Sequence, residues 1–320
     1  VPYRIKPYEE ILKDPNSTIV YDAKLAAAIE RRIERTGTDG KLLHGGDGSI
    51  SHVNLLEKLL IPALSKISNL VPGGGIWMNT QRPEWNDANN ALVGNGLSMV
   101  TLYHLHRYMR FLEQLLEGID GDVIRISNEV IGWFEELRAI LEESRGILES
   151  DAPGGGEAKK ILDALGRAFS AYRIKVYASG FSGKGELSTR RIAAFCGTAI
   201  DYLDHSIRLN RREDGLYHSY NILRMTRDGK EISIDHLYEM LEGQVAVLGS
   251  GAVGAEEAVE LVSRLFESRM YDDTRRSFML YPERELPGVL ERNAVPGDGA
   301  RALPLLAELL EAGDRSIIER

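Results

Sequence analysis

One stretch in the first third of the chain gathers the side chains that carbohydrate chemistry requires. Residues 72–101 place two tryptophans, six amides, one arginine and two carboxylates in a segment that we expect to form a loop before a helix. Indole rings stack on the apolar faces of sugars, while amides and carboxylates hydrogen-bond sugar hydroxyls. A carboxyl group held against an indole in a partly dry pocket has a raised pKa, which suits a general acid. The composition of this stretch is therefore that of a sugar-binding site that also holds a proton donor.

The same residues also fit a purely structural interpretation. Trp77 and Trp85 would then be core residues, and the polar residues from Asn86 to Asn90 would cap turns. Composition alone leaves both interpretations open.

The order of residues within this stretch resembles a known motif. The runs 84–90 (Glu-Trp-Asn-Asp-Ala-Asn-Asn) and 94–98 (Gly-Asn-Gly-Leu-Ser) resemble the Asp-Trp-Asn-Asp…Gly-x-Gly-Glu-Ser motif of the inverting glycoside phosphorylases, which include cellobiose and chitobiose phosphorylase. A later run, 234–252, is similar to a helix of that family with the pattern Ile-Asp-x-Ile…Gln-x-x-Ala-Val-x-Ser-Gly-Ala. The chain departs from the motif at Glu84, where the family has Asp, and at Leu97, where it has Glu.

The resemblance implies an inverting cleavage of a glycosidic bond in a β-glucoside or related oligosaccharide, with Asp87 as the general acid. We take Glu242, on the second matching segment, as the candidate catalytic base, ahead of Glu239 and Asp235; a solvated helix face is the alternative for each. The expected substrate-binding residues are Arg82, Glu84, Trp85, Asn86, Asn89, Asn90 and Gln244.

Two nucleophiles remain open. An inverting hydrolase uses a second carboxylate to activate water, and its two carboxyl groups stand roughly 6.5–9.5 Å apart. An inverting phosphorylase needs no base, because inorganic phosphate attacks directly as a co-substrate and requires an anion site. We expect no other cofactor and no metal site.

Two further functions compete with cleavage. The chain could be a non-catalytic helical module that binds sugars or serves as a scaffold. The run from Gly249 to Gly254 formally matches a dinucleotide fingerprint, which would indicate an NAD-dependent Rossmann oxidoreductase. The segment before Gln244 has a helical pattern and not that of a strand, so we prefer a helix end with glycine caps.

The spacing of apolar residues indicates that the elements that position these residues are mostly helices. Apolar spacing predicts helices at 21–36, 52–70, 97–117, 122–149, 157–171, 187–210, 234–248, 255–268 and 301–312. A minor β-hairpin is expected where Asp228 and Gly229 separate residues 220–225 from 231–234. The predicted fold is therefore all-α, an (α/α)6-toroid-like helical barrel or a large part of one. We expect a single domain over residues 1–320, with 150–156 as the best candidate for a boundary.

Composition and charge limit the classes of partner and the location that we expect for the chain. The net charge of −9 argues against nucleic acid, and no apolar stretch reaches the length of a membrane span. The single cysteine, Cys196, follows an apolar run and is expected in the core; it fits a reducing, cytoplasmic location. Members of the resembled family are far longer, which implies a partial chain with further domains, or a homodimer, as the expected context.

Overall fold

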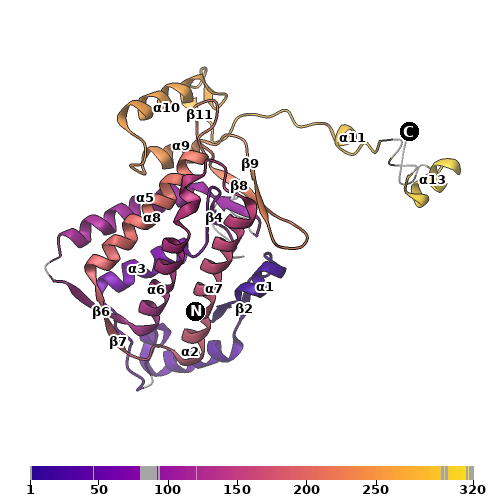
Figure 1. Cartoon of the computed structure of the whole chain (residues 1–320). Coiled ribbons are helices and arrows are strands. Elements are labelled where there is room, and N and C mark those ends of the chain that lie inside the picture. Colours follow the sequence, from indigo (N-terminus) through magenta and orange to yellow (C-terminus); the bar gives the residue numbers. More distant parts are fainter. Residues whose placement is uncertain are drawn as a thin grey trace. The chain divides into compact units, whose positions relative to one another are not determined.

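The computed structural model describes residues 2–45, 47–79, 92, 94–119, 121–296, 299, 302–314 and 316. The chain divides into two compact units, Val1–Pro282 and Glu283–Arg320 (Figure 1). The described residues of the second unit include the short helices α11 (Val289–Arg292) and α13 (Pro304–Glu311). The residues that concern function lie in the first unit.

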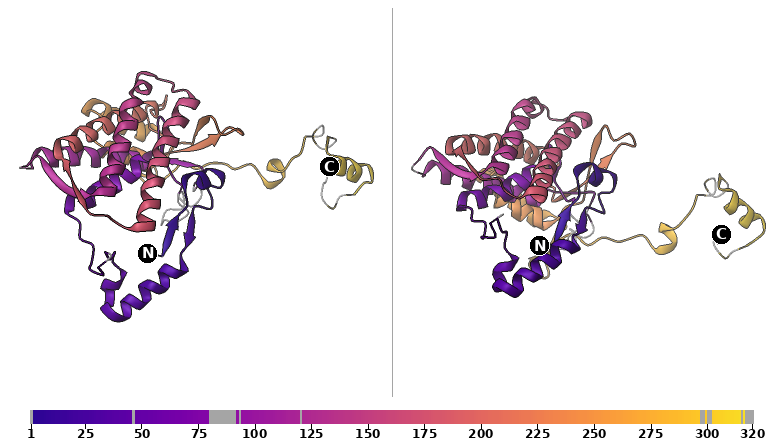
Figure 2. Two further views of the ribbon diagram at one scale, coloured as in Figure 1. Left: turned by 60° about the horizontal axis from the view of Figure 1, so that its bottom comes forward. Right: turned by 90° about the horizontal axis from the view of Figure 1, so that it is seen from below.

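Four helices form the body of the first unit: α5 packs along α8, and α6 packs along α7 (Figures 1 and 2). In α5 the buried side chains recur every three or four residues, from Leu102 through Leu105 and Met109 to Leu112. The Ser98 hydroxyl caps its first turn by accepting the Thr101 N–H. The four helices are α5 (Met99–Glu117), α6 (Asn128–Glu143), α7 (Gly155–Ser179) and α8 (Thr189–Leu209).

A five-stranded antiparallel sheet, in the order β3-β4-β5-β8-β9, contacts α5 and α7. The strand β5 directly precedes α5, and β9 packs against α7, where the backbone of Gly155 meets the Ile232 carbonyl. A separate two-stranded ladder, β6-β7, directly precedes α6 and α8. The strands are β3 (Leu70–Val71), β4 (Gly75–Trp77), β5 (Gly96–Ser98), β6 (Val123–Ser127), β7 (Lys184–Ser188), β8 (Tyr220–Met225) and β9 (Ile232–His236).

The remaining elements of the first unit surround this body. Helix α3 packs on α5 and α6, whereas α2 has no buried residue. These elements are β1 (Tyr3–Ile5), α1 (Tyr8–Lys13), β2 (Ile19–Tyr21), α2 (Ala23–Thr36), η1 (Gly37–Lys41), α3 (Leu55–Ile67), η2 (Arg145–Glu149), α9 (Leu241–Leu248), α10 (Ala255–Glu267), β10 (Tyr271–Asp272) and β11 (Ser277–Phe278).

The prediction of an all-α, toroid-like barrel is wrong, because the central sheet makes this a mixed α/β fold. The predicted hairpin at Asp228 and Gly229 is present, but it forms two strands of that larger sheet. The other strands are only two or three residues long, and β5 pairs with β8 across more than 120 residues. Strands of two or three residues are too short to show a period of their own, and β5 also needs a partner far along the chain.

Two predicted helices were wrong at their starts. Residues 123–127 form β6 and pair with β7, so α6 begins only at Asn128. Residues 232–236 form β9, so the predicted helix over 234–248 is confirmed only for α9. The prediction that Cys196 packs in the core is confirmed, because its side chain is fully buried. Within the described ranges, no helix combines the length and the apolar character that crossing a membrane requires.

Candidate active site on the central sheet

The segment with the predicted acid connects two neighbouring strands of the central sheet. Trp77 at the end of β4 pairs with Leu97 in β5, and the Met78 N–H donates to the Gly96 carbonyl. The Gly94 N–H donates in turn to the Met78 carbonyl. The predicted site residues between these strands lie outside the described residues: Arg82, Glu84, Trp85, Asn86, Asp87, Asn89 and Asn90.

Trp77 anchors the base of this connection. Its side chain is buried, and the indole N–H donates to the Gly94 carbonyl at 2.9 Å. The ring of Tyr8 meets it edge to face, with 6.4 Å between the ring centroids. Trp77 is therefore a core residue, as the structural interpretation of the sequence expected for it.

Glu242, the predicted base, is tied to the same sheet. It lies in the first turn of α9 and is half-buried. Its carboxylate accepts a hydrogen bond from the Tyr220 hydroxyl at 3.0 Å. Tyr220 in β8 pairs with Ser98 in β5, the strand that ends the connection carrying Asp87. The structure thus brings the element of Glu242 to the strand next to that connection.

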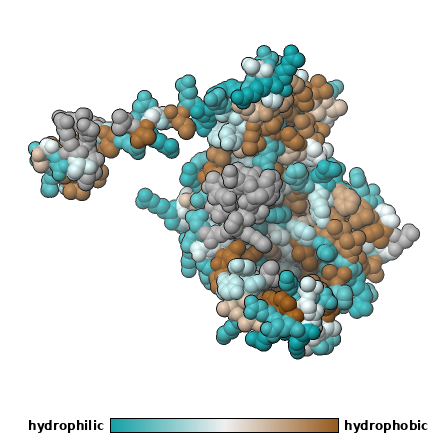
Figure 3. Space-filling view, turned by 180° about the vertical axis from the view of Figure 1, so that it is seen from behind, coloured by the Kyte–Doolittle hydropathy of each residue, from teal (hydrophilic) through white to brown (hydrophobic). Residues whose placement is uncertain are grey.

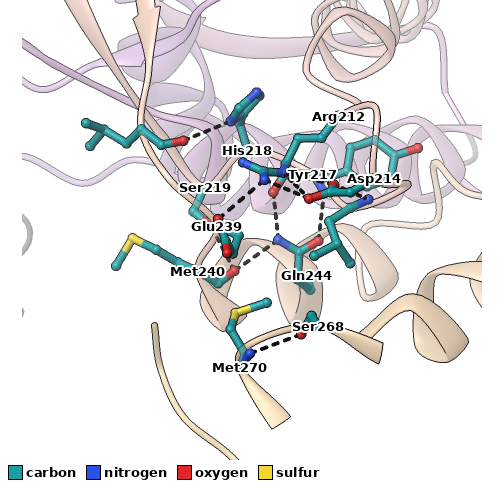
Figure 4. Close-up of polar contacts among 12 residues, drawn as sticks. Arg212, Asp214, Tyr217, His218, Ser219, Glu239, Met240, Gln244, Ser268 and Met270 are labelled. Atoms are coloured by element: carbon teal, nitrogen blue, oxygen red, sulfur yellow. Dashed lines mark hydrogen bonds and ion pairs between the residues drawn. The ribbon is translucent and has the colours of Figure 1, made fainter. Parts of the chain in front are cut away.

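Gln244 has a structural position. Its side chain is fully buried, and its amide is hydrogen-bonded within the chain (Figure 4). The amide oxygen accepts the Tyr217 N–H at 2.8 Å, and the amide nitrogen donates to the carbonyls of Tyr217 and Met240. These bonds fix the loop before β8 onto α9. The Gln244 amide, which the resemblance assigned to substrate binding, therefore hydrogen-bonds backbone groups of the chain itself.

Ser219 joins the same two segments. Its hydroxyl donates to the Met240 carbonyl and accepts the Gly243 N–H at 2.9 Å. A Cβ at Gly243 would lie 2.2 Å from the Ser219 hydroxyl oxygen, so the approach requires glycine. Glu242 is therefore carried by a helix whose first turn is held through Met240 and Gly243, one on each side of it.

The two lesser candidates for a base are both paired with arginines. The Asp235 carboxylate lies 2.9 Å from the Arg224 Nε and is exposed. Glu239 lies 3.3 Å from Arg212, which also contacts Asp214 at 2.7 Å (Figure 4). Both carboxylates are therefore engaged by guanidinium groups.

The Arg212 cluster lines a cavity of about 670 Å³. Partial burial raises the pKa of the Asp214 carboxyl, but hydrogen bonds from Arg212 and the Leu216 N–H outweigh it and hold the pKa below its ordinary value. Four arginines and five carboxylates line this cavity, so its charge does not favour a free anion such as phosphate. The charged residues are Arg211, Arg212, Glu213, Asp214, Glu239, Glu260, Arg264, Glu267 and Arg269.

Two stacked histidines lie next to this part of the chain, one just before β8 and one at the end of β9. The rings of His218 and His236 are nearly parallel, with 4.1 Å between their centroids. Burial, the neighbouring His236 ring and Arg212 lower the pKa of His218 to about 4. Partial burial also lowers the pKa of His236, although Asp235 opposes the effect. Both rings are therefore neutral near pH 7, which lets them stack without charge repulsion.

Sequence reasoning missed these residues, although a signal for one of them was present. Counting outward from the turn at Asp228 and Gly229 places Asn221 opposite His236, and this is the observed register. The contact of His236 with His218 had no such signal, because His218 lies before the strand begins.

The dinucleotide fingerprint has the wrong structural context. The run from Gly249 to Gly254 follows helix α9, whereas a Rossmann fingerprint follows a parallel strand. The central sheet is antiparallel at each of its pairings. No group of three or more candidate metal ligands occurs among the residues that the structure describes.

No known protein-family model matches the chain, and no curated protein matches it significantly.

Proposed function

We propose that this chain binds a β-linked glucoside or related oligosaccharide at the central sheet and cleaves a glycosidic bond with inversion. Asp87 is the general acid in this proposal, and Trp85 and its polar neighbours contact the sugar. The observation that carries the proposal is the tie between two distant segments. The strand β5, which ends the connection carrying Asp87, pairs with β8, and β8 holds Glu242 through the Tyr220 hydroxyl.

Glu242 supplies the second carboxylate that hydrolysis requires. A carboxylate that accepts a hydrogen bond has a fixed orientation, as a general base that must meet a water molecule requires. We therefore favour water over phosphate as the nucleophile. The Arg212 cavity has more carboxylates than arginines, whereas a phosphorylase needs an anion site with excess positive charge.

Product analysis on a panel of β-linked oligosaccharides, with and without phosphate, tests the proposal. The wild-type chain should release free sugar without phosphate, and Asp87→Asn should lower the rate by about 100-fold or more. Glu242→Gln should lower phosphate-independent cleavage similarly, because glutamine cannot accept the proton of the attacking water.

Asp235→Asn is the matched control, since this exposed carboxylate lies on the neighbouring strand β9. It should keep most of the activity. Formation of a sugar 1-phosphate that depends on Asp87 but not on Glu242 would replace hydrolysis by phosphorolysis. Folded protein that yields no product from any substrate would reject the catalytic proposal.

A further inference from the structure

A second cavity opens beside the central sheet and shares no lining residue with the Arg212 cavity. Its volume is about 310 Å³, at the lower end of the range for small-molecule sites. It lies between the turn at Pro72 and Gly73, the segment 151–155 and strand β9. This size suits one ring-sized ligand better than an extended chain.

The walls of this cavity are held by buried hydrogen bonds. The Gly73 N–H donates to the Ser206 hydroxyl, and the Asn210 amide donates to the Gly73 carbonyl. Gly73 has a φ of 75°, a conformation that favours glycine, so the turn is specified by the sequence. On the other side, Gly155 packs directly on the Ile232 carbonyl and fixes the start of α7 against β9.

The hydrogen bonds of Asn221 define which nitrogen of His236, a residue of the cavity wall, carries the proton. Asn221 donates from its amide nitrogen to the carbonyl of Gly74 and to the side chain of Asn210. Its amide oxygen therefore accepts from the Nδ1–H of His236 at 2.8 Å. With Nδ1 protonated in the neutral ring, the His236 Nε2 carries a lone pair and accepts a hydrogen bond.

The lining combines apolar surface with a few polar groups. Pro153 and Ile234 give aliphatic surface, and Asp151 and His236 give oxygen and nitrogen atoms. A pyranose needs this combination, because its C–H face is apolar while its hydroxyls donate and accept hydrogen bonds. An anion fits less well, since the Asp151 carboxylate opposes the favourable field of the α7 N-terminus.

We infer that this cavity is a binding subsite for one neutral pyranose unit, in which Asp151 and His236 hydrogen-bond the sugar hydroxyls. The inference rests on the sugar specificity proposed above, but it does not depend on catalysis by Asp87. It assigns to the segment 151–153 and to β9 a role in substrate recognition.

Calorimetric titration of the full chain with methyl β-glucoside, methyl β-galactoside and inorganic phosphate tests the subsite. At least one glycoside should bind saturably, and Asp151→Ala should weaken its binding about tenfold, since a hydrogen bond to a charged group is lost. Glu149→Ala removes an exposed carboxylate two residues before Asp151 that does not line the cavity, and it should bind normally.

Asp87→Asn separates this inference from the proposed activity. Glycoside binding that survives Asp87→Asn and is lost in Asp151→Ala supports the subsite even when no cleavage is found. Equal binding by Asp151→Ala and wild type would overturn it even in an active enzyme. Binding of phosphate in place of both glycosides, or of neither probe, would also overturn it.

Discussion

At the residue scale, the junction between the loop before β8 and helix α9 depends on one buried amide. Gln244 satisfies both backbone groups of Tyr217 and the carbonyl of Met240. A buried backbone group without a partner costs about 1–3 kcal/mol. The orientation of Glu242, two residues earlier, depends on the same junction.

Gln244→Ala should therefore lower the free energy of unfolding by about 2–4 kcal/mol, because it strands buried donors and acceptors. Urea unfolding followed by circular dichroism measures this loss. Val245→Ala, at the next position but 59% exposed, should change stability by less than about 0.5 kcal/mol. An equal effect of the two substitutions would contradict the assigned role of the amide.

The stacked histidines predict a pH dependence of stability. Folded His218 stays neutral down to about pH 4, whereas an unfolded imidazole takes a proton near pH 6.5. The unfolded state therefore binds more protons in this window, and the free energy of unfolding falls as the pH drops from 6.5 to 4. We expect a contribution on the order of 1 kcal/mol, because the rings are partly exposed to solvent.

Urea unfolding at a series of pH values checks this contribution. The His218→Gln variant should show a shallower fall of stability between pH 6.5 and 4 than wild type. The same substitution at the exposed His52 is the control and should leave the slope unchanged. A wild-type slope in His218→Gln would mean that other groups cause the dependence.

At the element scale, α10 has two contrasting faces. Leu261 and Leu265 are buried, whereas Val259, Val262 and Phe266 are exposed. In Figure 3 apolar side chains gather at the top of the molecule, over this part of the first unit. Sequence period predicted the helix correctly but could not decide which apolar residues it buries.

Leu261→Ala should destabilise the chain by about 2–5 kcal/mol, since Leu261 is 1% exposed and its loss leaves a cavity. Val259→Ala on the same helix should cost less than about 0.5 kcal/mol, because Val259 is 68% exposed. Thermal or urea unfolding distinguishes the two. A large loss for Val259→Ala would mean that this face is covered in solution.

At the scale of the whole molecule, the buried core runs from Tyr8 to Met270 and lies entirely within the first unit. A chain that ends at Pro282 should therefore keep its helical signal. Its thermal midpoint should stay within about 2 °C of the longer chain, which corresponds to less than roughly 1 kcal/mol. Differential scanning calorimetry measures this midpoint, and a drop of many degrees would show that residues 283–320 stabilise the core.

The sequence by itself determined the helices that have a strong apolar period. The predicted helix over 97–117 is confirmed as α5, and that over 187–210 as α8, because burying one face leaves a repeat of three to four residues. The turn at Asp228 and Gly229 was also determined locally, since this pair adopts the backbone conformation that a tight hairpin needs. The core position of Cys196 followed from its apolar neighbours.

Only the tertiary structure decided the central sheet and the role of Gln244. Strands of two or three residues are stabilised by partners far along the chain, so their own residues give no period to detect. The sequence shows the same glutamine whether its amide binds a ligand or hydrogen-bonds buried backbone groups. Their difference depends on which backbone atoms surround them, and Tyr217 reaches Gln244 only because the sheet and α9 place them together.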